Sequence, residues 1–198
     1  NLVSNILDKY NTLKFVYKKA RTVPKKLGTS KERNNNMSTY INRKLEEFNK
    51  SIENKKIAII GIGVSNIPLV EYFSKHDANV TVFDRKTLDK LDEKAIEIIK
   101  KYNIDYSLGE NNLSKLKGFD YIFRSPSCRP DTKELVEEAN RGAIITSEIE
   151  MLIKLCPGTV VGITGSDGKT TTTSLTYTIL KEKGYDCYLG GNIGIPLF

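Results

Sequence analysis

The chain has 198 residues, 39% of them hydrophobic, and a formal net charge of +7. This length supports one complete core, or about one and a half domains. No apolar run approaches the ~20 residues that a membrane-spanning helix needs, and no signal peptide opens the chain. The only histidine, His76, excludes a histidine-cluster metal site, and three scattered cysteines (Cys128, Cys156 and Cys187) predict reduced thiols and a cytoplasmic location.

The positive charge lies entirely at the start of the chain. Residues 1–36 hold nine Lys or Arg residues against two acidic ones, whereas residues 37–198 hold 22 of each sign. A neutral body argues against a nucleic-acid partner. Within the basic arm, six apolar residues follow helical spacing and predict an amphipathic helix: Val3, Ile6, Leu7, Tyr10, Leu13 and Tyr17. Residues 22–36 are polar and basic and predict disorder.

After Met37 the pattern alternates between strands and helices. Strands are predicted at residues 56–60, 79–83, 104–106, 121–123 and 143–145. Apolar spacing predicts helices around residues 40–48, 70–73, 88–102 and 135–139, and a capping box at Ser147 opens another through Leu155. We therefore expect an α/β fold with a Rossmann-like, doubly wound parallel sheet that binds ligands at the carboxyl ends of its strands. Pro157-Gly158 marks the domain boundary, which gives domains over 37–156 and 157–198.

The first strand leads into a glycine turn, Gly61-Ile62-Gly63-Val64-Ser65-Asn66. An acidic residue, Asp84, follows the second strand 21 positions after Gly63. This spacing is close to the dinucleotide fingerprint, but Asn66 occupies the position of its third glycine. The segment alone leaves a nicotinamide-binding half open as an alternative.

A second glycine turn follows residues 159–163, which predict a buried parallel strand. Its candidate ATP-binding residues are Gly165, Ser166, Asp167, Gly168, Lys169, Thr170 and Thr171. The glycines let backbone N–H groups converge on an anion, Lys169 supplies charge for the β- and γ-phosphates, and the Thr170 hydroxyl can reach Mg²⁺. Ile163 stands where the usual phosphate loop has its first glycine. The alternative is a plain strand–turn–helix closed by Gly184.

The helix after this turn is predicted to place Leu175, Ile179 and Leu180 on its inner face, with the run of threonines capping N–H groups in its first turn. A second strand is predicted at residues 185–189. Two strands and one helix cannot bury a nucleotide-binding core. We therefore expect residues 157–198 to be the start of an ATP-binding P-loop domain in a longer polypeptide.

Residues 164–171 resemble the ATP loop of the Mur ligases and of their folylpolyglutamate synthetase relatives. Four further signals resemble the D-glutamate-adding members of the Mur ligase family: Gly61-x-Gly63-x-Ser65, Asp84, Arg124-Ser125-Pro126 and Gly191-Asn192-Ile193-Gly194-x-Pro196. Ser127 stands where the family usually has glycine.

The resemblance implies that the first domain holds the UDP end of UDP-N-acetylmuramoyl-L-alanine. Backbone N–H groups at Val64, Ser65 and Asn66 would meet the diphosphate. Uridine would lie beside Asp84, Arg85 and Lys86, with Ser125 and Pro126 closing over it.

The family's reaction is ATP-dependent and Mg²⁺-dependent ligation through an acyl phosphate. The L-alanine carboxylate is phosphorylated, and the amine of D-glutamate then attacks it. Lys169 and Asn192 would be catalytic, with Asn192 between ATP and the carboxylate, and Thr170 would contact the metal. The resemblance further implies a cytoplasmic, monomeric enzyme of peptidoglycan synthesis. Two alternatives stay open: another Mur-type or folylpolyglutamate-type ligase, and a nucleotide-binding module that does not catalyse.

Every feature that resembles the family lies after Met37. We therefore expect residues 1–36 to lie outside the working enzyme and not to be translated. Lys31-Glu32-Arg33 can be encoded by a purine-rich ribosome-binding core, with Asn34-Asn35-Asn36 as an A/T-rich spacer before the start codon. The alternative is a genuine basic arm that docks on a membrane surface or a partner.

Overall fold

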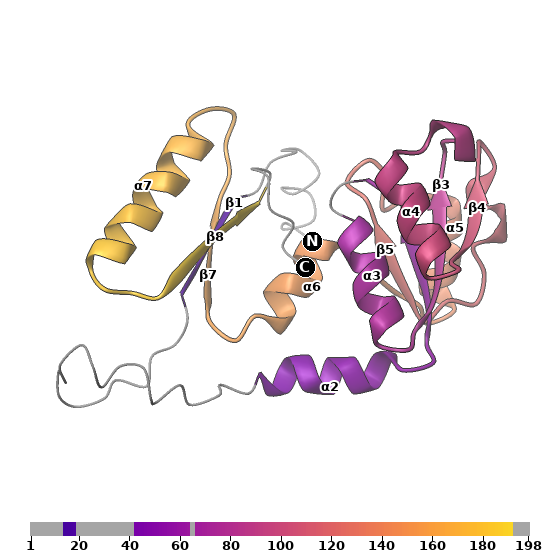
Figure 1. Ribbon diagram of the computed structural model, residues 1–198, viewed down its shortest axis with the longest axis horizontal. Coiled ribbons are helices and arrows are strands. Elements are labelled where there is room, and N and C mark those ends of the chain that lie inside the picture. Colours follow the sequence, from indigo (N-terminus) through magenta and orange to yellow (C-terminus); the bar gives the residue numbers. More distant parts are fainter. Residues whose placement is uncertain (1–13, 19–41, 64–65, 192–198) are drawn as a thin grey trace.

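The structure, a computed structural model, describes residues 14–18, 42–63 and 66–191, with the backbone alone for residues 14–18 and 191 (Figure 1). Its larger sheet has five parallel strands in the order β4-β3-β2-β5-β6. These strands are β2 (Lys56–Ile60), β3 (Asn79–Asp84), β4 (Asp105–Leu108), β5 (Tyr121–Arg124) and β6 (Ile144–Thr146). The predicted α/β fold with a parallel, Rossmann-like sheet is confirmed.

The helices of this part are α2 (Arg43–Ile52), α3 (Ile67–Lys75), α4 (Glu93–Lys101), α5 (Lys133–Asn140) and α6 (Glu148–Leu155), with short 3-10 turns η2 (Leu88–Lys90) and η3 (Asn112–Lys115). Ser147 caps α6 as predicted, since its hydroxyl accepts the Glu150 N–H at 3.3 Å. Among the described residues no helix has the length and apolarity needed to span a bilayer.

Alternate residues of β2 point to opposite faces of the sheet and so divide the core in two. Ile57 and Ile59 belong to the larger cluster, which α2, α3, α4 and α6 cover. Ala58 and Ile60 belong to the smaller cluster, which Leu135 of α5 helps to cover. Because both faces are buried, β2 is apolar from Ile57 to Ile60 rather than alternating.

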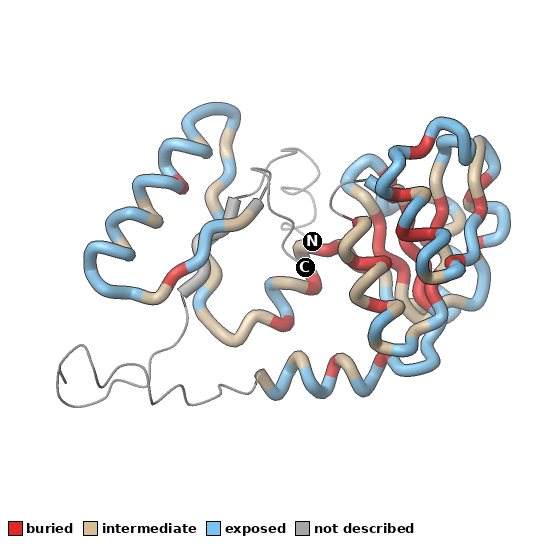
Figure 2. The backbone as a smooth tube through the Cα atoms, viewed as in Figure 1, coloured by how far each residue is buried: buried red, intermediate tan, exposed pale blue. Residues whose placement is uncertain are grey.

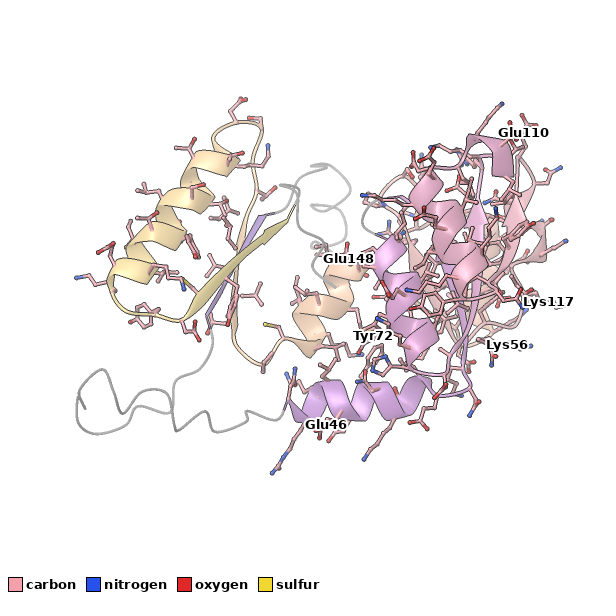
Figure 3. All side chains as sticks on the ribbon, in the orientation of Figure 1. Glu46, Lys56, Tyr72, Glu110, Lys117 and Glu148 are labelled. Carbon is pink, nitrogen blue, oxygen red and sulfur yellow. The ribbon has the colours of Figure 1, made fainter. Side chains whose placement is uncertain are left out.

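The helix α2 joins this core through contacts at both ends. Its N-cap Asn42 donates from Nδ2 to the Leu155 carbonyl oxygen at the end of α6, 2.9 Å away. Farther along, the Tyr72 hydroxyl of α3 donates to Oδ1 of Asn49, and Figure 3 shows Tyr72 on the side of α3 that faces α2. Burial raises the pKa of Tyr72. The helix α2 ends four residues after the predicted end at residue 48, because Ile52 is also buried in this core.

The single helix predicted over residues 88–102 is wrong in its first turn. The chain forms η2, becomes extended at Leu91 and Asp92, and only then begins α4. Leu91 is buried in the core from this extended segment. Helical spacing therefore matched a buried residue that reaches the core without a helix.

A second, smaller sheet contains β7 (Thr159–Ile163), β1 (Lys14–Lys18) and β8 (Cys187–Gly191), in the order β7-β1-β8. The middle strand β1 pairs antiparallel with both neighbours. Two predictions are corrected here. Residues 159–163 form the predicted strand, but this strand is mostly exposed and pairs with β1 in the antiparallel direction. The basic arm is neither helical nor disordered at residues 14–18, while its other residues lie outside the described ones.

The helix α7 (Lys169–Glu182) connects β7 to β8. Its predicted inner face is wrong at Leu175 and Ile179, which are 58% and 52% exposed, whereas Leu180 is half-buried. Thr173 is the buried residue of α7. Figure 2 shows the difference: buried residues are concentrated in the five-stranded part, whereas the residues of α7 are mostly exposed. Of the predicted capping threonines, Thr173 donates its hydroxyl to the Lys169 carbonyl oxygen one turn back.

Candidate functional site

The order of the larger sheet reverses between β2 and β5, the strands whose carboxyl ends carry the predicted turns. Ligands of open α/β sheets bind at this point, outside the carboxyl ends of the strands. The two ends are tied together, since the Ser125 N–H donates to the Ile60 carbonyl oxygen at 2.9 Å. The sequence-predicted turns after β2, β3 and β5 therefore meet at one edge.

Gly61 is required at this edge for two reasons. Its φ of +83° lies in the left-handed region, which residues with a side chain rarely adopt. A Cβ added there would lie 2.7 Å from the Ser125 Oγ and 2.9 Å from the Ser125 Cβ. The glycine thus lets the loop after β5 approach the turn after β2.

Asp84 connects the turns after β2 and β3. Its Oδ2 accepts the Ile62 N–H at 2.9 Å, and its Oδ1 accepts the Lys86 N–H at 2.8 Å. Both carboxylate oxygens are therefore bonded to backbone within the protein. The neighbouring side chains of Arg85 and Lys86 are exposed.

Asn66 is the N-cap of α3, and its side chain is only 5% exposed. Its Nδ2 donates to the Gly61 carbonyl oxygen at 2.7 Å and lies 3.4 Å from the Ile60 carbonyl oxygen. The amide occupies the position at which the third glycine of a dinucleotide fingerprint lets helix and strand pack closely. The two preceding predicted residues, Val64 and Ser65, lie outside the described ones.

The loop after β5 folds into a tight turn. The Cys128 N–H donates to the Ser125 carbonyl oxygen at 3.0 Å, and the hydroxyls of Ser125 and Ser127 lie 2.9 Å apart. Beneath it, the buried Arg124 donates from Nη1 to the Cys128 carbonyl oxygen at 3.1 Å. Burial raises the pKa of the Cys128 thiol, so this cysteine stays protonated.

A pocket opens between these turns. It is lined by Ile60, Gly61, Phe83, Asp84, Arg85, Asn112, Leu113, Ser125, Ser127 and Cys128. Of the predicted substrate residues it brings together Asp84, Arg85 and Ser125, whereas Asn66, Lys86 and Pro126 are not among its lining. The sequence analysis missed Asn112 and Leu113. Their position in the chain could have indicated them, because they follow β4, whose carboxyl end lies at the same edge of the sheet.

The second turn precedes α7. Gly168 is the N-cap of the helix with φ +71°, and Gly165 has φ +153°, so both lie in the region that favours glycine. Lys169 folds back over the turn: its Nζ lies 2.5 Å from the Gly165 carbonyl oxygen and 2.8 Å from that of Ser166. The lysine thus holds the turn closed through bonds that a phosphate could replace.

The remaining residues of this turn are open to solvent. Ser166, Asp167, Thr170 and Thr171 are exposed. Asn192 lies outside the described residues. Within the part of the chain that the structure describes, no group of three or more His, Cys, Asp or Glu side chains could hold a metal ion. A magnesium ion here would depend on the Thr170 hydroxyl and on phosphate oxygens.

Residues 55–147 match the family model described as the N-terminal domain of MurD-like Mur ligases. This part of the chain is similar to the N-terminal domains of MurD-like Mur ligases. The UDP-N-acetylmuramoylalanine–D-glutamate ligase of Ruminiclostridium cellulolyticum is 54% identical over 157 residues, covering 79% of this chain and 34% of that protein. The ligase of the same name from Clostridium acetobutylicum is 53% identical over 156 residues, with the same shares of each chain. The resemblance to the Mur ligase family is therefore confirmed.

The chain spans about a third of the length of these Mur ligases. The alignment of 157 residues is longer than the matched domain, so similarity to the ligases extends beyond it. Among solved structures, shikimate dehydrogenase from Aquifex aeolicus is 16% identical, with a TM-score of 0.38 over 58% of this chain and 51% of that one.

Proposed function

We propose that this chain is the N-terminal part of an ATP-dependent ligase that adds D-glutamate to UDP-N-acetylmuramoyl-L-alanine. The pocket between β2, β3 and β5 would hold the UDP end of the substrate, and the turn before α7 would hold ATP. The observation that carries this proposal is the identity of 54% to a ligase of that name. The whole reaction belongs to the complete protein.

One contact favours a UDP-sugar over a dinucleotide in the pocket. Asn66 fills the position at which a third glycine lets helix and strand pack closely in dinucleotide sites. Asp84 accepts two backbone N–H groups and so joins the turns after β2 and β3. With the lone pairs that remain, Asp84 would accept one further donor from the uridine, and Arg85 and Lys86 would supply positive charge nearby.

At the second turn, N–H groups at the start of α7 favour negative charge. Lys169 would exchange its carbonyl partners for the β- and γ-phosphates, and Thr170 would contact Mg²⁺, which supplies charge neutralisation. The γ-phosphoryl group would pass to the L-alanine carboxylate and give an acyl phosphate and ADP. The amine of D-glutamate would then attack, forming the amide and releasing phosphate. Asn192 would lie beside the carboxylate.

The predicted cellular setting stays part of this proposal. Cys128, Cys156 and Cys187 are all free thiols, which fits a reducing cytoplasm. The monomeric state and the domain boundary at Pro157-Gly158 also stay predictions.

The proposal is tested in the complete ligase with UDP-N-acetylmuramoyl-L-alanine, D-glutamate and ATP. Lys169→Ala is expected to lower turnover by about 10²–10³, or about 3–4 kcal/mol of transition-state stabilisation. Lys183→Ala, at the other end of α7, is the control and should keep the full rate. Near-normal turnover of Lys169→Ala would contradict the ATP-binding assignment. Ligation of a folate or of a different UDP-sugar would favour another ligase of the family, and ATP binding without ADP formation would favour a binding module.

A further inference from the structure

Asp167 and Gly168, in the turn before α7, are the only Asp-Gly or Asn-Gly pair in the sequence. Both residues are exposed to solvent. A Cβ added to Gly168 would meet nothing within 4 Å, so there is open space beside its backbone. Because glycine has no Cβ of its own, the preceding side chain can approach its backbone nitrogen closely. The aspartate carboxyl group and the next backbone nitrogen therefore have room to meet.

Neither of these groups is held by the rest of the protein. Gly168 is the N-cap of α7, so its N–H group precedes the hydrogen-bond ladder of the helix. Among the described residues this N–H group donates to no carbonyl oxygen, and the Asp167 carboxylate forms no hydrogen bond or ion pair. Asp92, the exposed N-cap of α4, also makes no cap bond, but Glu93 follows it. The chain thus contains a comparison site that lacks the glycine.

The two groups can react with each other without any ligand. The Gly168 nitrogen loses its proton and attacks Cγ of the neutral Asp167 carboxyl group, and one carboxyl oxygen leaves as water. The product is a cyclic imide, a succinimide. Water then adds to the main-chain carbonyl carbon of the ring and breaks the bond from that carbon to nitrogen. This leaves isoaspartate, in which the main chain runs through Cβ and Cγ and the former main-chain carbonyl is a free carboxylate.

We propose that Asp167-Gly168 is a site of spontaneous isomerisation to isoaspartate, and that this change disables the phosphate turn. The product lengthens the main chain by a carbon atom inside the turn. Lys169 Nζ, which lies 2.5 Å and 2.8 Å from the carbonyl oxygens of Gly165 and Ser166, reaches across the altered position. The start of α7 and its N–H groups would therefore shift relative to these carbonyl oxygens. The isomerisation itself is independent of the proposed function, whereas the loss of phosphate binding rests on it.

The first test follows the chemistry alone. The 198-residue chain is incubated at neutral pH and physiological temperature, and isoaspartate is measured with an isoaspartyl methyltransferase and located by mass spectrometry of its peptides. Isoaspartate is expected to form at Asp167 at least about tenfold faster than at Asp92, because only Asp167 precedes glycine. In Asp167→Glu the corresponding ring is larger and closes slowly, so the signal from this turn should disappear. No isoaspartate at Asp167, or equal rates at Asp167 and Asp92, would overturn the proposal.

The second test asks what the change does to the turn, using ATP binding by the complete ligase before and after the same incubation. ATP affinity should fall in proportion to the isoaspartate formed, and repair with the methyltransferase and S-adenosylmethionine should restore it. In Asp167→Glu, whatever its starting affinity, incubation should cause no decline. Unchanged affinity in isomerised protein would overturn the disabling role. Absence of ATP binding by fresh ligase would overturn the proposed ATP site, and the disabling role with it, while the first test would still decide the isomerisation.

Discussion

Glu138 is a charged residue whose role is to hold the fold. It is fully buried on α5, and its Oε2 accepts the N–H groups of Gly118 and Phe119 at 2.7 Å and 3.2 Å. Arg141 donates to its other oxygen. The carboxylate thereby anchors the segment that leads into β5 and the turn after it. Helical spacing indicates this burial, since Glu138 lies three positions after the buried Leu135 on one helix face.

We expect Glu138→Ala to lower the free energy of unfolding by about 2–3 kcal/mol, because two backbone N–H groups lose their acceptor in a partly buried site. Urea denaturation of the five-stranded part, followed by circular dichroism, measures the change. Glu137→Ala is the control, since Glu137 is exposed and, among the described residues, forms ion pairs with Lys133 and Arg141 at the surface. Its effect should stay within about 0.5 kcal/mol. Equal effects of the two variants would refute the anchoring role.

Glu71 on α3 is expected to make the stability of the fold depend on pH. Its hydrogen bond with Lys75 is the largest of several contacts that lower its pKa to about 2, followed by those with Tyr102 and Lys101. Folding therefore favours the charged form of the Glu71 carboxyl. Its contribution to stability is therefore fully present above its ordinary value of 4.5 and is lost as the pH falls through about 2.

An NMR titration of the Glu71 carboxyl carbon should give a midpoint near pH 2. In Tyr102→Phe the midpoint should rise, because the hydroxyl that donates to Glu71 Oε1 at 3.0 Å is gone. Tyr106→Phe, which alters an exposed tyrosine on β4, should leave the midpoint unchanged. A midpoint at the ordinary value in the unsubstituted chain would show that these contacts do not form in solution.

At the scale of elements, short β-branched or apolar runs bounded by turn residues were the most predictable. The strands β2 and β7 have the predicted bounds because β-branched residues are bounded by turns. The prediction of one helix over residues 88–102 was wrong, because apolar spacing cannot distinguish a helix from an extended segment that places one leucine in the core. The predicted pairing and burial of β7 were wrong, because they depend on which strand lies beside it. The strand that does so is β1, which comes from the start of the chain.

β1 gives the element-scale prediction. Val16 is its central residue and pairs with Val161 of β7 and Leu189 of β8. Removing residues 1–36, or introducing Val16→Pro, takes away ladder bonds in the middle of this small sheet. We expect faster amide hydrogen exchange at β7 and β8 in both variants and unchanged exchange at β2 and β3. Unchanged protection of β7 and β8 would support the prediction that the arm lies outside the working protein.

At the scale of the whole molecule, the fold class was predictable because strand–helix alternation and right-handed crossovers leave few arrangements for a parallel sheet. The site was predictable only in part. Asp84 and Ser125 follow from their positions after strands, and the structure places both in the pocket. The pocket residues Asn112 and Leu113 could not be predicted, because their place in the pocket depends on contacts between turns that are distant in sequence.

The central claim is that the five-stranded part holds a UDP-sugar and not a dinucleotide. The most direct measurement is a calorimetric titration of the 198-residue chain with UDP-N-acetylmuramoyl-L-alanine and, separately, with NADH. We predict saturable binding of the UDP-sugar and none of NADH, with Asp84→Ala weakening the former, since Asp84 connects the turns of the pocket. Saturable binding of NADH without any response to the UDP-sugar would contradict the account.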